Sequence, residues 1–77
     1  MPIAFLLLNV RPGREEEVLR ELQAIREVKE ANRVYGVYDT VVKIETENME
    51  KLKETMNNRI KKLEHITSVV SLIVTSA

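Results

Sequence analysis

The chain has 77 residues, no cysteine, one histidine, and twelve basic side chains balanced by twelve acidic ones. This length predicts one domain, the lack of cysteine excludes disulfide and thiolate chemistry, and the zero net charge argues against a nucleic-acid-binding surface. A domain this small buries only roughly 60% of its unfolded surface, which favours oligomerisation.

The first half of the chain reads as strand, helix, strand. Ile3 to Val10 is apolar at both alternating sets of positions, the pattern of a strand buried on both faces. A stripe at helical spacing predicts an amphipathic helix from Arg14 to Ile25. Val28 to Val34 alternates and is polar, so we expect it at an edge of the sheet.

The second half repeats this order. Thr40 to Thr46 reads as a strand, and Thr46 or Asn48 can cap the helix that follows it. Val69 to Thr75 closes the chain as a strand that is apolar on both faces. We expect His65 and Thr67 in the preceding connection, with His65 exposed. The apolar stripe of the second helix consists of Met49, Leu52, Met56, Ile60 and Leu63.

This order predicts an α+β, ferredoxin-like βαββαβ fold that occupies residues 1–77 as a single domain. Right-handed crossovers place both helices on one face of a four-stranded antiparallel sheet. The other face of the first and last strands would then expose Val, Leu and Ile side chains. We therefore expect a homodimer that packs sheet against sheet, as in a dimeric α/β barrel. A charge at Leu72 or Ile73 should split the dimer or unfold it.

The sequence offers little catalytic chemistry. It has no metal-ligand spacing and no glycine-rich phosphate loop, so we expect no catalytic residues, no metal and no cofactor. Phe5 is the one aromatic residue of the expected central strands, which disfavours RNA binding, and a copper-binding CxxC is absent. The apolar start MPIAFLLLNV lacks a basic n-region and is too short to span a bilayer, so we expect no membrane contact and a cytoplasmic location.

The segment VYGVYD, Val34 to Asp39, separates the two middle strands. It can be a plain hairpin turn, in which Gly36 supplies a positive φ and Asp39 accepts a local hydrogen bond. It can also be a receptor, because backbone N–H groups in a turn attract an anion and a nearby carboxylate accepts an ammonium group. These are the two charged groups of a free amino acid. Tyr38 could form a wall of such a site.

The string GVYDTVVKI, between a polar strand and a helix, resembles the ligand-binding (RAM) domain of the Lrp/AsnC regulators, which carries a G-x-Y-D turn. The resemblance covers essentially the whole chain. It implies that Gly36, Val37 and Tyr38 form the turn of an amino-acid-binding site and that Asp39 accepts the ammonium group. Polar side chains of the last strand also contribute in that family. Ser71 matches such a position, and Val69 stands where some members have a hydroxyl.

The resemblance also implies partners. Such domains form dimers through their sheets, often assemble as octamers of four dimers, and bind an amino acid effector between dimers. The regulators add a helix-turn-helix domain, whereas this chain starts at the first RAM strand. It therefore resembles stand-alone RAM modules, which do not bind DNA directly but could assemble with full-length Lrp/AsnC regulators in amino acid-responsive transcription. The ligand that the resemblance implies is a free amino acid or a related small metabolite.

Two other functions stay open. The chain could be a pure oligomerisation module with a vestigial site, or a small enzyme of the dimeric α/β-barrel class. Enzymes of that class place polar or aromatic groups inside the barrel, where this chain offers Asn9 and little else. On the receptor hypothesis, Asp39→Ala should abolish amino acid binding and barely change stability.

Overall fold

The computed structural model describes residues 1–75 and has the expected βαββαβ order. The strands are β1 (Ile3–Val10), β2 (Val28–Arg33), β3 (Thr40–Glu45) and β4 (Ile66–Ile73). The helices are α1 (Glu15–Gln23) and α2 (Met49–Glu54), and α2 continues as the π-helical turns η1 (Thr55–Ile60).

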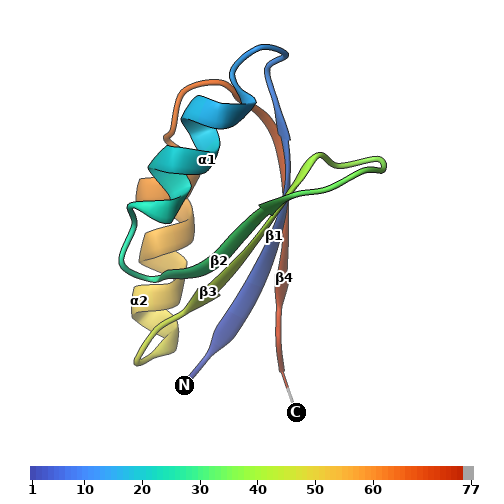
Figure 1. Cartoon of the computed structure of the whole chain (residues 1–77). Coiled ribbons are helices and arrows are strands. Elements are labelled where there is room, and N and C mark those ends of the chain that lie inside the picture. The colour runs from blue at the N-terminus through green and yellow to red at the C-terminus, as the bar shows by residue number, and fades with distance from the viewer. Residues whose placement is uncertain (76–77) are drawn as a thin grey trace.

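The four strands form one antiparallel sheet in the order β2-β3-β1-β4. Both helices lie on one face of this sheet, and the other face carries no helix (Figure 1). The ferredoxin-like α+β fold is therefore confirmed, as is the expected edge position of β2. The neighbours β1 and β3 are not consecutive in the chain. They lie side by side because α1 carries the chain from β1 over to the edge strand β2, and β3 then fills the place between β2 and β1.

The core lies between the sheet and the helices. Alternate side chains of β1 and β3 point toward the helices and are buried, as the period of two in a strand requires. Burying one such Leu or Ile side chain stabilises the fold by about 1.5–3 kcal/mol. The largest fully buried side chains are Leu6, Leu8, Leu22, Ile44, Leu52, Ile60, Val18 and Val42.

Local hydrogen bonds decide where the second helix begins. Of the two expected caps, Asn48 is the N-cap, because its side chain accepts a hydrogen bond of 2.8 Å from Lys51 N. The Thr46 hydroxyl instead donates to Asn48 O at 2.7 Å, which holds the connection. The sequence did not indicate the change to π-helical turns from Thr55, where the Thr55 hydroxyl donates to Lys51 O.

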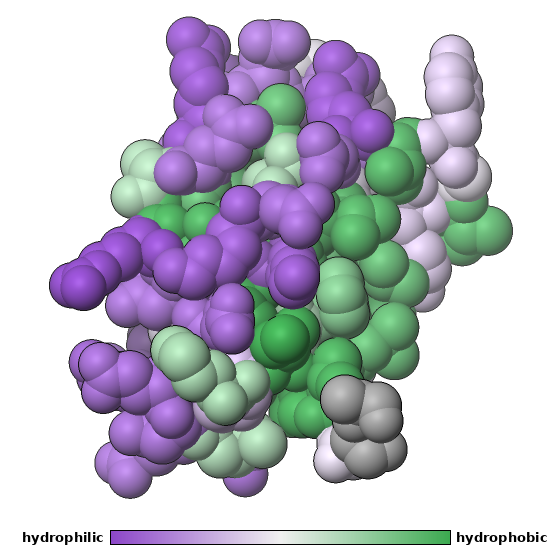
Figure 2. All heavy atoms as spheres, turned by 60° about the horizontal axis from the view of Figure 1, so that its bottom comes forward, coloured by the Kyte–Doolittle hydropathy of each residue, from purple (hydrophilic) through white to green (hydrophobic). Residues whose placement is uncertain are grey.

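The face without helices, which we call the open face, is apolar over β1 and β4. Phe5 and Leu7 of β1 are half-buried, and their cross-strand neighbours Leu72 and Val70 of β4 are 51% and 36% exposed. Figure 2 shows apolar side chains gathered on this side of the molecule and hydrophilic ones over the helices. An uncovered apolar face of this kind marks an interaction surface.

Strand β4 differs from the prediction in two respects. It begins at Ile66 rather than Val69, because Ser68 pairs with Asn9 and the Thr67 hydroxyl donates to Asn9 O at 3.2 Å. Thr67 is thus part of the strand and not of the connection. The strand is also an edge strand that is exposed or half-buried along its length, so its apolar pattern does not reflect burial on both faces.

Candidate functional site

The segment Val34 to Asp39 is a turn that connects β2 to β3 and projects from the side of the sheet opposite the helices (Figure 1). Val34 N donates to Asp39 O at 2.9 Å, which closes the base of the turn. At the tip, Tyr35 is fully exposed and Val37 is 85% exposed. An aromatic and an aliphatic side chain are thus held away from the body of the protomer.

Gly36 has φ +146, so the expected positive φ is confirmed. This backbone conformation is strongly disfavoured for residues with a Cβ atom. Within residues 1–75, the backbone N–H groups of Tyr35, Gly36, Val37 and Tyr38 donate to no protein acceptor. Four consecutive donors are therefore available to water or to an anionic ligand.

Asp39 lies at the base of the turn and is half-buried. Its Oδ2 accepts from Val10 N at 3.2 Å, and its Oδ1 accepts from the Thr40 hydroxyl at 3.1 Å. The carboxylate therefore ties the turn to the end of β1, so removing it should destabilise the domain more than the sequence led us to expect. A carboxylate has about four lone-pair positions, so two bonds leave acceptor capacity for an ammonium group.

Ser71 does not lie beside this turn in the protomer. It pairs with Leu6, whose other neighbour is Val42, and strand geometry puts it on the order of 14 Å from Asp39. Alternation also places Ser71 on the helix side of the sheet and Asp39 on the open face. The structure thus brings Gly36, Val37, Tyr38 and Asp39 together, while Ser71 could join them only from another copy.

The sequence reasoning missed a polar pair on the open face near the turn. Asn9 Nδ2 donates to the Ser68 hydroxyl at 3.0 Å, and Asn9 follows Leu8, whose carbonyl accepts from Asp39 N at 3.0 Å. Asn9 was noticed only as the single polar residue of its strand. Ser68 could not be paired with it because the register of β4 is not readable from the sequence.

Two surface hollows of the described residues lie away from the turn. One, of about 300 Å³, follows the outer side of β2 from Val28 to Asn32, and another, of about 160 Å³, lies near Thr46. Neither hollow is lined by a residue of the turn, and the backbone donors of the turn point into open solvent. A site built on the turn would therefore need further walls.

His65, the only histidine, lies apart from the turn in the chain. His65 is in the connection, as expected, but its side chain is only 15% exposed, and its Nε2 lies 3.6 Å from the Glu17 carboxylate. Within residues 1–75, no three His, Asp or Glu side chains are grouped as metal ligands. In the same range, no helix has the length and apolar composition needed to cross a membrane.

Comparison with known proteins places the fold in a family. The model of the Lrp/AsnC ligand-binding domain matches residues 3–77. The HTH-type transcriptional regulator FL11 of Pyrococcus furiosus is 33% identical over 72 residues, which cover 94% of this chain and 47% of the regulator. The chain thus spans about half the length of that curated relative.

Solved structures give the same result. Hypothetical protein PHS023 of Pyrococcus horikoshii is 38% identical with a TM-score of 0.93, over 100% of this chain and 93% of that one. The regulator NMB0573 of Neisseria meningitidis, solved with L-Met, shares the fold with a TM-score of 0.86 at 14% identity, over 97% of this chain and 50% of that one. This chain belongs to the Lrp/AsnC family, and the match is to the ligand-binding domain of that family.

Proposed function

We propose that this domain binds a free amino acid through the turn from Gly36 to Asp39 and that a second copy completes the site. The observation that carries the proposal is that one turn holds both free hydrogen-bond donors and a carboxylate. Free backbone N–H groups precede a carboxylate that retains acceptor capacity. These groups match the carboxylate and the ammonium group of an amino acid. The regulator NMB0573, which has the same fold, was solved in complex with L-Met.

The second copy is needed because the turn has no enclosing walls. Ligand sites bury most of a small ligand, whereas Tyr35 and Val37 are surrounded by solvent in the protomer. The open face is uncovered on the same side of the sheet (Figures 1 and 2). A dimer that packs sheet against sheet would cover Phe5, Leu7 and Leu72, and contacts between dimers, as in an octamer, could bring Ser71 to a turn.

In this proposal the domain acts by assembly and not by catalysis. Ligand binding at a contact between copies stabilises the assembled state by mass action. Full-length Lrp/AsnC regulators are candidate partners, because the 33% identity to FL11 extends over nearly the whole chain. Partner binding would then depend on the amino acid.

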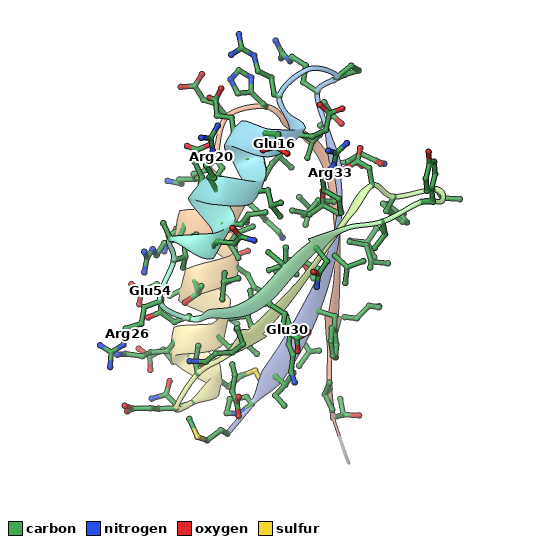
Figure 3. All side chains as sticks on the ribbon, viewed as in Figure 1. Glu16, Arg20, Arg26, Glu30, Arg33 and Glu54 are labelled. Carbon is green, nitrogen blue, oxygen red and sulfur yellow. The ribbon has the colours of Figure 1, made fainter. Side chains whose placement is uncertain are left out.

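The test is a thermal-shift screen of the purified protein against the twenty amino acids at millimolar concentration, with light scattering on each hit. Asp39→Asn keeps an acceptor oxygen but removes the charge, and should abolish the shift. Glu16→Gln is the matched control, because Glu16 is an exposed carboxylate on α1 (Figure 3) and should leave the shift unchanged. A shift that survives in Asp39→Asn would contradict the ammonium role.

A pure assembly module is the second candidate, and one observation favours it. The bonds from Asp39 to Val10 and Thr40 give the carboxylate a structural role that needs no ligand. A screen without any hit, on a well-folded oligomer, would support this function over the first. The enzyme alternative draws no comparable support, because Asn9 is already hydrogen-bonded to Ser68.

A further inference from the structure

The apolar side chains of the open face stop at one end of the sheet. On β1, Leu7 points to this face, and Asn9 is the next residue on the same side. Its neighbour on β4 is Ser68, which lies opposite Asn9 just as Val70 lies opposite Leu7. We call Asn9 and Ser68 the polar end of the open face.

Hydrogen bonds hold the polar end next to Asp39. Asp39 N donates to Leu8 O at 3.0 Å, and the Asp39 carboxylate accepts from Val10 N at 3.2 Å. Leu8 and Val10 are the residues on either side of Asn9, so Asn9 is a direct neighbour of Asp39 across the two strands. An amino acid whose ammonium group binds Asp39 can therefore reach Asn9 with its own side chain.

The polar end keeps free hydrogen-bonding capacity. Asn9 Nδ2 donates to the Ser68 hydroxyl at 3.0 Å. Within residues 1–75, the side-chain oxygen of Asn9 accepts no hydrogen bond from the protein, and the Ser68 hydroxyl donates none to it. The pair thus offers a ligand both an acceptor and a donor, and neither residue is charged.

Enclosure of the site decides what these groups require. In the protomer the Asn9–Ser68 bond is exposed, so water satisfies the remaining acceptor and donor. Once a second copy covers the turn, as the proposed function requires, the polar end loses this water. An aliphatic side chain of the ligand would then leave both groups without a partner, at a cost in binding free energy. A ligand side chain that forms hydrogen bonds avoids this cost.

We propose that Asn9 and Ser68 are specificity-determining residues, and that the ligand is an amino acid whose uncharged side chain donates and accepts hydrogen bonds, such as a carboxamide or a hydroxyl. The inference rests on the proposed function, because the turn from Gly36 to Asp39 must hold the carboxylate and the ammonium group of the same ligand. It goes further, since those two groups are common to all amino acids and do not distinguish one side chain from another.

The first test compares amino acids of nearly the same shape in pairs: asparagine with leucine, glutamine with methionine, and threonine with valine. Thermal shifts over a range of concentrations give the affinity of the wild-type protein for each. In a pair that binds, the polar member should bind roughly tenfold or more tightly, because the apolar member leaves enclosed groups unpaired.

The outcomes separate this inference from the proposed function. If the apolar members bind as tightly as the polar ones or more tightly, and Asp39→Asn abolishes that binding, the selectivity is wrong while the turn remains the binding site. If none of the twenty amino acids binds, the proposed function and the selectivity both fail.

The second test assigns the selectivity to its residues. Asn9→Leu keeps the shape of the side chain and removes its donor and its acceptor, so the preference within each pair should disappear. Asn58→Leu is the matched control, because Asn58 is exposed on η1, and it should keep the wild-type preference. A preference that persists in Asn9→Leu, shown by circular dichroism to be folded, would overturn the role of Asn9. Ser68→Ala should weaken the preference in the same direction, and it decides the matter if Asn9→Leu does not fold.

Discussion

The same strands carry apolar side chains on both faces of the sheet, but the two sets of side chains differ in burial. On β1, Ala4, Leu6 and Leu8 are completely buried under the helices, while Phe5 and Leu7 between them are half-buried on the open face. Both sets are equally apolar, so hydrophobicity alone does not distinguish a core residue from an interface residue. The difference lies in what covers each face: the helices of the protomer on one side, and a second copy, we propose, on the other.

The largest effect is expected on the helix side. Leu6→Ala should lower the free energy of unfolding by about 2–5 kcal/mol, because it leaves a cavity in a site with no exposed surface. Leu7→Ala, its neighbour on the open face, should cost the protomer less and weaken self-association instead. Urea unfolding and light scattering on both variants measure the contrast. Equal losses of protomer stability would contradict the division between the faces.

Two adjacent residues of β4 sharpen the same contrast. Ile73 pairs with Ala4 on the helix side and packs against the core, whereas Leu72 pairs with Phe5 on the open face. From the sequence, a charge at either residue could unfold the domain or split the dimer, and the two positions now lead us to expect a different outcome for each. Ile73→Glu should unfold the domain, and Leu72→Glu should give a folded protein of smaller mass. Circular dichroism separates the two, and a folded, fully associated Leu72→Glu variant would count against sheet-on-sheet packing.

Substitutions of Asp39 test whether its hydrogen bonds to Val10 and Thr40 stabilise the domain. Asp39→Ala should destabilise the domain by about 1–3 kcal/mol, because Val10 N and the Thr40 hydroxyl lose their acceptor. Asp39→Asn should lose less stability, since the amide oxygen can still accept a hydrogen bond. The comparison is made by urea unfolding at one pH. If both variants are as stable as wild type, the two hydrogen bonds contribute nothing.

The smallest effect is expected in the polar half of the open face. Lys43 lies opposite Phe5 and is 3.9 Å from Glu30, in an ion pair whose side chains are 32% and 62% exposed. Lys43→Ala should change stability by less than about 1 kcal/mol, as exposed ion pairs do. A loss as large as that of Leu6→Ala would mean that this half of the face is also essential to the fold.

The order of elements was readable from the sequence because hydrophobic periods of two and 3.6 alternate along it. Gly36 was identified for the correct reason, since a turn at that position needs a positive φ. The contacts of Asp39 were not readable, because its partner Val10 lies 29 positions earlier. The face occupied by Ser71 depends on the register of β4 with β1, and no local pattern encodes that register.

An NMR titration of the labelled protein shows whether the Gly36–Asp39 turn binds an amino acid. With a ligand from the thermal-shift screen, the amide signals of Gly36, Val37 and Tyr38 should shift first and saturate together with the thermal stabilisation. If saturating ligand leaves these three signals unmoved and shifts those around Thr46 instead, the turn is not the binding site.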